Sequence, residues 1–462
     1  MNRLRISFVA FLSILAVLPA GAVVPAAEPS WKAGLARANI TPAEPMWMAG
    51  YASRNRPAEG KLHDLWIKVL ALEDAKGSRA VVVTSDLCGF SKINYDAIAA
   101  EVKKRCGLDR SQLKLTCSHT HSGPVFRDIA YDCYPLTAEQ IARIDSYSLG
   151  LEKTIVDKIG EALANLRPAT VWAGEGKAEF AVNRRNNRET DVAAIRQRGE
   201  SLKGPNDFAV PVLAVKSAEG SLKGIVFGYA CHATTLSINQ WSGDYPGFTQ
   251  IALEERHPEA VAMFYQGCGA DQNPLPRRTV ELCQQYGRKL AETVETVLAG
   301  PLRPMAPRLE TAIELIDLPY GQQPTADELK PLAEKDTYQG RWAKRLLESL
   351  EKGEPLPKCY AEFPVQVWRL GDDQLWISLG GEAVVDYALM FKKAYGPRTW
   401  VNGYTNDVMS YVPSKRVLDE GGYEAGGFAA CGLPANTWGP DIEERITSAV
   451  QGMVEKLAAA NE

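Results

Sequence analysis

Three of the five histidines in this 462-residue chain lie in a pattern that suits metal chemistry. His119, His121 and His232 each follow a short apolar segment, and Glu382 follows another after two glycines. Side chains in a strand alternate between its faces, so His119 and His121 are predicted to project on the same side. Neutral imidazole is the commonest metal ligand, and catalytic zinc takes three protein ligands and water. The pattern predicts a metal site, with buried hydrogen-bonded histidines as the alternative.

A recurring pattern of apolar runs indicates which elements position these side chains. Six runs rich in β-branched and aromatic residues, each ending in polar residues, are typical of buried strands. They lie at 80–83, 113–115, 225–230, 261–265, 375–379 and 400–404. Helical patterns occur at about 94–105, 138–165, 247–257, 279–298 and 383–395. We therefore predict an α/β fold, with mixed β-sheets flanked by helices and the metal site at strand carboxyl ends. Asp86 and Asp244, also at strand ends, are expected to orient the ligand histidines, with caps of the strand ends as the alternative.

Composition and charge exclude several classes of protein. The chain is 45% hydrophobic, 23% charged and 8% aromatic, and 52 Lys and Arg against 56 Asp and Glu give a formal charge of −4. These values are those of an ordinary globular protein, without the basic excess that nucleic-acid binding needs. At about 150 residues per domain the length allows three domains. Because six strand ends carry polar residues suited to one shared site, we predict a single large domain over 28–462.

The N-terminus has the pattern of an export signal. Residues 1–5 are basic, an apolar run extends from Ile6 to about Leu18, and small residues continue to Ala27. This predicts a cleaved signal peptide over 1–27. An uncleaved anchor is the alternative, but the run is shorter than the ~20 residues that a membrane span needs. We expect an exported protein, periplasmic or extracellular, with no transmembrane segment in the mature chain.

Two further features leave alternatives open. The nine cysteines form no C-x-x-C motif, and an odd number outside the cytosol leaves at least one thiol unpaired or paired between chains. They are interpreted as buried apolar residues together with one or a few disulfides. The charged stretch 321–357, with a helical pattern from 329 to 350, is either a lid over the site or a solvated connector.

Several motifs resemble, in the same order, those of the neutral/alkaline non-lysosomal ceramidase family. The most specific is Ser118-His119-Thr120-His121-Ser122-Gly123-Pro124, which resembles the family signature T-H-T-H-S-G-P. The others are the segment 34–42 with G-Y-A at 50–52, V-N-R at 182–184, A-C-H at 230–232, S-G-D-Y-P-G at 242–247, G-E at 381–382, N-D-V-M-S-Y-V at 406–412 and G-G-Y-E at 421–424. So many motifs in one order make the resemblance specific.

The resemblance implies one catalytic zinc ion per chain and a role for each matching residue. The zinc ligands would be His119, His232, Glu382 and the phenol oxygen of Tyr411. His121 would then handle protons instead of binding the metal. Two further residues would bind or polarise the substrate carbonyl, namely Arg184 and Tyr423.

The chain departs from the family pattern in two places. The family carries a serine in a G-D-x-S-P-N block, whereas residues 267–274 contain none, and Gln272 falls nearest its place. Gln272 could donate a hydrogen bond but cannot act as an alcohol. The chain also ends at Glu462, where the family continues into a C-terminal β-sandwich domain.

These observations predict an exported zinc-dependent hydrolase that uses metal-activated water to cleave an N-acyl amide bond, ceramide-like or other. Its partner would be a small-molecule or lipid-like substrate, and not a nucleic acid. The alternatives are a zinc esterase or other hydrolase acting on a non-lipid substrate, a binuclear enzyme with both His119 and His121 as ligands, and a non-catalytic binding protein that keeps the fold.

Overall fold

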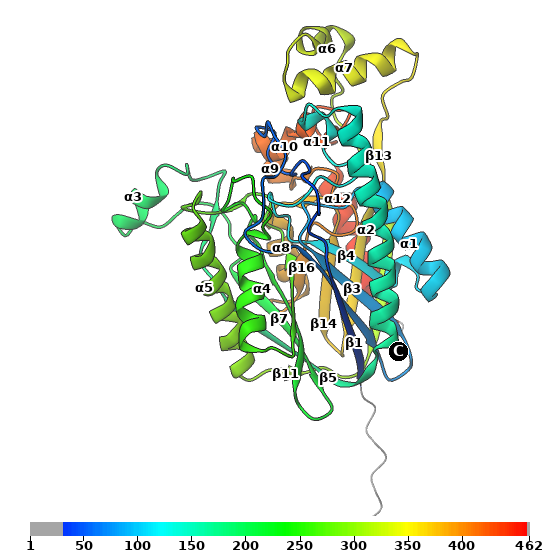
Figure 1. The fold of residues 1–462 in the computed structure, drawn as a ribbon, viewed down its shortest axis with the longest axis vertical. Helices are drawn as coiled ribbons and strands as arrows, with labels where there is room; N and C mark the ends of the chain where they lie inside the picture. Colours follow the sequence, from blue (N-terminus) through cyan, green and yellow to red (C-terminus); the bar gives the residue numbers. More distant parts are fainter. Residues whose placement is uncertain (1–30, 460–462) are drawn as a thin grey trace, which may run out of the picture.

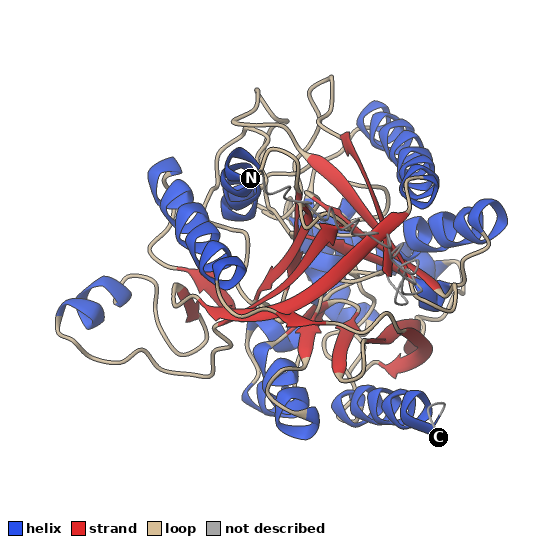
Figure 2. Cartoon of the chain, turned by 90° about the horizontal axis from the view of Figure 1, so that it is seen from below, coloured by secondary structure: helices blue, strands red, loops and turns tan. Residues whose placement is uncertain are grey.

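A nine-stranded mixed sheet forms the centre of the fold in this computed structural model, which describes residues 31–459 (Figures 1 and 2). The spatial order is β4-β3-β2-β1-β5-β7-β8-β9, with β11 beside β5. The strands are β1 Trp31–Asn39, β2 Trp66–Glu73, β3 Arg79–Ser85, β4 Leu113–Cys117, β5 Arg167–Lys177, β7 Ala209–Ser217, β8 Leu222–Tyr229, β9 Val261–Gln266 and β11 Arg303–Pro304. The sheet curls so that β4, at one end of this order, approaches β9 at the other. The predicted signal peptide at 1–27 lies outside the described residues.

A second sheet packs against the first. Its order is β12-β13-β14-β16, with β14 and β16 parallel. Its strands are β12 Leu309–Pro319, β13 Cys359–Leu370, β14 Gln374–Leu379 and β16 Trp400–Asn402. Between the sheets lies a buried apolar layer that includes Trp31, Trp368, Trp376 and Trp400. Two small two-stranded sheets complete the strands: β6 Ala181–Asn183 with β10 Gln272–Pro274, and β15 Glu382–Ala383 with β17 Tyr411–Val412.

Helices cover the outer faces of both sheets (Figure 2). One half of the large sheet is covered by α1 Lys92–Cys106 and α2 Ala138–Ala164, and the other half by α4 Asp244–Arg256 and α5 Val280–Ala299. The second sheet carries α8 Val385–Tyr395 and α12 Ile442–Ala459. The short helices are η1 Arg110–Gln112, η2 Tyr131–Cys133, α3 Val192–Gln197, α9 Lys415–Glu420, α10 Tyr423–Gly426 and α11 Phe428–Cys431. The predicted α/β class with mixed sheets is confirmed, and each of the six apolar runs forms a strand.

The stretch 321–357 forms a small helical excursion at one end of the molecule (Figure 1). The helical pattern predicted over 329–350 corresponds to two separate helices, α6 Ala326–Ala333 and α7 Tyr338–Glu351. Thr337 is the N-cap residue of α7, and its Oγ1 accepts a hydrogen bond from the Gly340 amide. The two helices share a core centred on Leu329 and Trp342, and the Trp342 indole donates to the Leu433 carbonyl at 2.8 Å. The excursion is therefore packed against the body at α11.

Two further sequence-based expectations can be compared with the structure. All nine cysteines are free thiols, so the expected disulfides are not present in the structure. Within residues 31–459, no helix is both long and apolar enough to cross a membrane.

Candidate metal centre and active site

Four residues predicted as metal ligands reach the site from loops and short strands. His119 lies two residues beyond β4, with a φ of 56°, and His232 lies three residues beyond β8. Glu382 and Tyr411 are direct partners in the parallel pairing of β15 with β17. This register places the two residues side by side on adjacent strands.

Three of these side chains converge on one point. The Nε2 atoms of His119 and His232 each lie 3.2 Å from the Oε2 atom of Glu382, and all three residues are buried. The Nδ1 atom of His119 lies 2.6 Å from the Cys88 carbonyl oxygen, and the Nδ1 atom of His232 lies 2.7 Å from that of Gly269. Because a carbonyl accepts only a donated N–H, both Nδ1 atoms carry a proton, and both Nε2 atoms face the carboxylate.

The carbonyls correct one sequence-based expectation. Neither Asp86 nor Asp244 bonds a ligand histidine. Asp86 accepts from the Trp66 amide at 2.9 Å, while Asp244 accepts from the amides of Thr235 and Leu236, in the loop that follows His232. Main-chain carbonyls orient the imidazoles, and the two carboxylates hold main-chain segments in place.

The charge state of this group suits a cation. Among the described residues, His232 Nε2 and Glu382 Oε2 have no hydrogen-bond partner although both are buried. Burial opposes ionisation of Glu382, but His119 and His232 hold the pKa of its carboxyl well below the usual value. Burial and then Arg184 lower the pKa of His232 to about 4, so its imidazole is neutral. A buried carboxylate and two imidazoles whose Nε2 atoms point at one oxygen are a donor set for a divalent cation.

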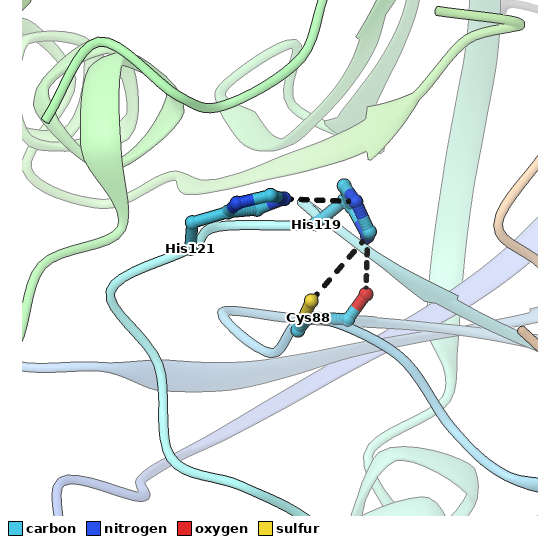
Figure 3. A group of neighbouring side chains, drawn as sticks. All are labelled: Cys88, His119 and His121. Carbon is cyan, nitrogen blue, oxygen red and sulfur yellow. Dashed lines mark hydrogen bonds between the residues drawn. The ribbon is translucent and has the colours of Figure 1, made fainter. Parts of the chain in front are cut away.

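His121 lies directly beside His119 (Figure 3), with its Nε2 atom 3.1 Å from that of His119. The expectation that both histidines project from one strand is wrong, because β4 ends at Cys117 and the loop brings the rings together. Burial, then His119 and His232, hold the pKa of His121 well below its usual value. Its Nδ1 atom has no partner among the described residues.

A second group of possible ligands comprises Cys88, His119 and His121. In this group, the His119 atom in contact with the Cys88 sulfur is Nδ1, so Nδ1 would be the ligand atom. That atom lies 3.6 Å from the Cys88 sulfur but 2.6 Å from the Cys88 carbonyl oxygen (Figure 3). The shorter contact commits the Nδ1 proton to the carbonyl, which favours the group that contains Glu382.

We call His119, His232, Glu382 and Tyr411 the candidate metal-binding group. Arg184 connects this group to the remaining predicted site residues. Its guanidinium donates to Glu424 at 2.7 Å and to the Tyr411 hydroxyl at 3.3 Å. Burial works against its charge, but Tyr411 and Glu424 more than offset this and raise the pKa of Arg184. The Tyr423 ring lies 5.0 Å from that of Tyr411, and its side chain is 53% exposed. Arg184 is therefore a fixed cation, whereas Tyr423 is open to a ligand.

Gln272 is placed differently from the other predicted residues. Its side chain accepts from Asn206 at 2.6 Å and donates to the Pro205 carbonyl at 3.2 Å. Its main-chain carbonyl accepts from the His232 amide at 3.0 Å. Gln272 lines neither of the two cavities described below. The residue thus contacts the site through the backbone of His232.

Two cavities meet at Tyr423. The first, of about 380 Å³, is lined by His119, His121, Glu382 and Tyr411 and continues to η2, α7 and α11. The second, of about 570 Å³, is lined by Arg184, Arg185, Arg188, Arg277 and Glu424 among others. Arg185 already pairs with Glu420 and Glu424.

Sequence reasoning missed Tyr404, which belongs to the site by packing. Its buried ring lies 4.6 Å from that of His119, and its hydroxyl has no partner among the described residues. Its neighbours Asn402 and Thr405 form isolated bridges with Gly267 and Thr116. The segment after β16 thus connects the ends of β9 and β4. In the sequence, its only signal was the polar end of the apolar run at 400–404.

The comparisons with known proteins agree with the fold. The family model for neutral/alkaline non-lysosomal ceramidase, N-terminal, matches residues 31–288, more than half of the chain. A solved structure described as a ceramidase complexed with C2 is 20% identical, with a TM-score of 0.70, over 91% of this chain and 74% of that one. The neutral ceramidase from Pseudomonas aeruginosa is 21% identical with the same TM-score, over 91% and 73%. No curated protein matches. At these identities the solved structures establish the fold.

Proposed function

Since the chain belongs to the neutral/alkaline non-lysosomal ceramidase family, we propose that it hydrolyses an N-acyl amide bond with the help of one zinc ion. The observation that carries the proposal is the convergence of His119, His232 and Glu382, with Tyr411 in register beside the carboxylate. Family membership supports the class of hydrolase. The donor set supports the metal.

Zinc fits the distances as well as the chemistry of the group. Two atoms that each bind one zinc ion at about 2.0–2.1 Å would lie no more than about 4 Å apart. Both separations between an imidazole nitrogen and the Glu382 oxygen are 3.2 Å. When bound, zinc lowers the pKa of water to about 7 and acts as a Lewis acid towards a carbonyl.

The chain's own residues supply the remaining steps. The imidazole of His121 takes a proton from the attacking water and delivers it to the leaving amine. The Tyr423 hydroxyl, at the junction of the two cavities, donates to the substrate carbonyl oxygen as negative charge develops there. Arg184, held by Glu424, keeps positive charge beside the Tyr411 phenol.

Metal analysis of the purified protein tests the proposal. We expect about one zinc per chain in the wild type, and its loss in His119→Ala and Glu382→Ala. His257→Ala is the matched control, because His257 pairs with Glu295 at a helix end instead of lining the site. A fully active, metal-free wild type would overturn the zinc assignment. Fluorogenic ceramide assayed beside short N-acyl amides and esters identifies the bond, and a protein that binds zinc but cleaves none of them would be a binding protein.

We further propose that residues 28–462 form one catalytic domain and that 1–27 direct export. N-terminal sequencing of the protein recovered outside the cytoplasm tests the second point. A mature chain that still begins at Met1 would contradict cleavage.

A further inference from the structure

The far end of the first cavity carries charged residues that the catalytic steps do not use. Beyond the metal-binding group, the cavity of about 380 Å³ is lined by charged side chains from several segments. They are Lys92, Asp128, Asp132, Arg345 and Asp407. We call this set the distal end of the cavity.

Both cations at the distal end already have partners. Lys92 lies 3.0 Å from Asp96 and 2.5 Å from Glu362. Arg345 lies 2.6 Å from Asp132 and donates to the Gly432 carbonyl as well. An anionic ligand would therefore have to displace a carboxylate from either cation.

Two of the carboxylates, Asp128 and Asp407, form no ion pair with a described residue, although Arg345 and Arg127 act to lower the pKa of Asp128 and Lys92 acts to lower that of Asp407. Asp407 is 1% exposed, and its Oδ2 atom accepts from the Tyr360 hydroxyl at 2.5 Å. Its Oδ1 atom is buried without a hydrogen-bond partner among the described residues. Burial raises the pKa of Asp407 to about 7 and also raises that of Asp128. The distal end therefore has more carboxylates than cations, and two of these carboxylates lack an ion-pair partner among the described residues.

Resting on the proposed amide hydrolysis, we propose that the half of the substrate that fills this cavity is short and ends in a protonated amine. An ammonium group can donate charge-assisted hydrogen bonds to Asp128 and Asp407. An alkyl chain would leave both carboxylates desolvated without a partner, which is costly. A volume of about 380 Å³ is near the lower end of the range for drug-sized ligands, which favours a short group over the long alkyl chains of a ceramide.

A matched substrate series tests the inference on the wild-type enzyme. Three fluorogenic amides of one chain length would end in an ammonium, a methyl or a carboxylate group. We expect kcat/KM to be about 10-fold higher for the ammonium than for the methyl compound, and lowest for the carboxylate. Equal rates, or a preference for methyl, for carboxylate or for ceramide, would overturn the inference.

Asp128→Asn locates the effect, because Asp128 lies in an exposed loop where substitution leaves the core intact. We expect the preference for ammonium over methyl to fall about 10-fold in this variant. Glu348→Gln is the control, since it removes the same charge from an exposed position of α7 that does not line the cavity. An unchanged preference in Asp128→Asn would contradict the assignment.

Binding without turnover separates this inference from the proposed function. Calorimetry would compare 6-aminohexanamide with hexanamide on Glu382→Gln, in which turnover is expected to be lost. Tighter binding of the ammonium compound supports the inference even where no amide is hydrolysed by the wild type. Hydrolysis of amides without any preference for charge supports the function and overturns the inference.

Discussion

The two ends of the first cavity are built in different ways. At the metal-binding end, main-chain groups fix the side chains: the carbonyls of Cys88 and Gly269 hold the histidines, and strand pairing holds Glu382 beside Tyr411. At the distal end, contacts between side chains and loops join segments far apart in the sequence. There Arg345 of α7 holds Asp132 of η2 and the carbonyl of Gly432 after α11.

This difference separates reactivity from substrate choice. A backbone framework keeps its geometry when one neighbouring side chain changes, whereas a wall made of side-chain contacts changes with each of them. We expect substitutions at the metal-binding end to affect every substrate alike. Substitutions at the distal end should change the order of preference among substrates.

Loss of a metal ligand should have the largest effect. His232→Ala removes one imidazole from the group around Glu382 and leaves that buried carboxylate with one partner fewer. Because a bound metal contributes several kcal/mol to the transition state, we expect kcat/KM to fall about 1,000-fold or more for every substrate. Zinc content by mass spectrometry should fall in parallel. A variant that keeps its zinc and its rate would show that His232 is not a ligand.

Displacement of His121 should have the next largest effect. Gly50 has a φ of 99°, and a Cβ atom there would lie 2.2 Å from Cγ of the His121 ring. We expect Gly50→Ala to move the imidazole and lower kcat about 10- to 100-fold, since general acid–base catalysis contributes about 10²–10⁴-fold. Zinc content should stay unchanged.

The matched control for this variant is Gly77→Ala. Gly77 has a φ of 85°, but a Cβ atom there meets nothing within 4 Å. It shares the backbone strain without the contact to His121. Equal losses of kcat in both variants would mean that strain alone lowers the rate.

The sequence predicted six of the strands, because an apolar run with a polar end is a local pattern, but it did not predict β1, β2, β5, β7, β12 or β13. It also marked His119, His232 and Glu382, which are polar residues just after such runs. It could not predict the carbonyls of Cys88 and Gly269 as partners of the histidines, because every residue has a carbonyl. The expectation for Asp86 and Asp244 failed for this reason.

Long-range contacts were equally out of reach. Arg345 belongs to a charged helix whose pattern suits a solvated connector, and only the fold brings it to Asp132, 213 positions earlier. Tyr411 entered the predicted ligand set through the family resemblance. Its register with Glu382, which explains its position, depends on two strands of two residues each.

Arg345→Ala tests the distal end with a smaller expected effect. The side chain is 46% exposed, so its ion pair with Asp132 contributes little to stability. Its loss should loosen the wall formed by η2 and α11, and we expect KM to rise about 3- to 10-fold while kcat and zinc content stay the same. Lys344→Ala, at the neighbouring exposed position, should change neither constant. A fall in kcat for all substrates would contradict the separation between the two ends.

The smallest effect on activity should come from Lys114, which lies on β4 beneath the metal-binding end. Its buried Nζ atom lies 4.4 Å from the ring centre of Trp368 and 3.9 Å from that of Trp376, and it has no hydrogen-bond partner among the described residues. Burial lowers its pKa well below the usual value. We expect Lys114→Met to keep full activity and to unfold at a higher concentration of urea at pH 7, because the variant no longer buries an ammonium or amine group.

The pH dependence of unfolding distinguishes burial from cation–π stabilisation. Because the pKa of Lys114 is depressed in the folded state, the unfolded chain binds more protons between that pKa and about 10.5. Over this range the free energy of unfolding of the wild type should rise with pH, by at most about 1.4 kcal/mol per pH unit. The advantage of Lys114→Met should therefore shrink from pH 7 to pH 10. Lys68→Met should instead destabilise at pH 7, because it leaves Glu254, 2.7 Å from the Lys68 nitrogen, with a weaker set of partners. If Lys114→Met also destabilised the protein at pH 7, Lys114 would be charged in the folded state and stabilised by Trp368 and Trp376. The packing of β4 below His119 would then depend on that cation.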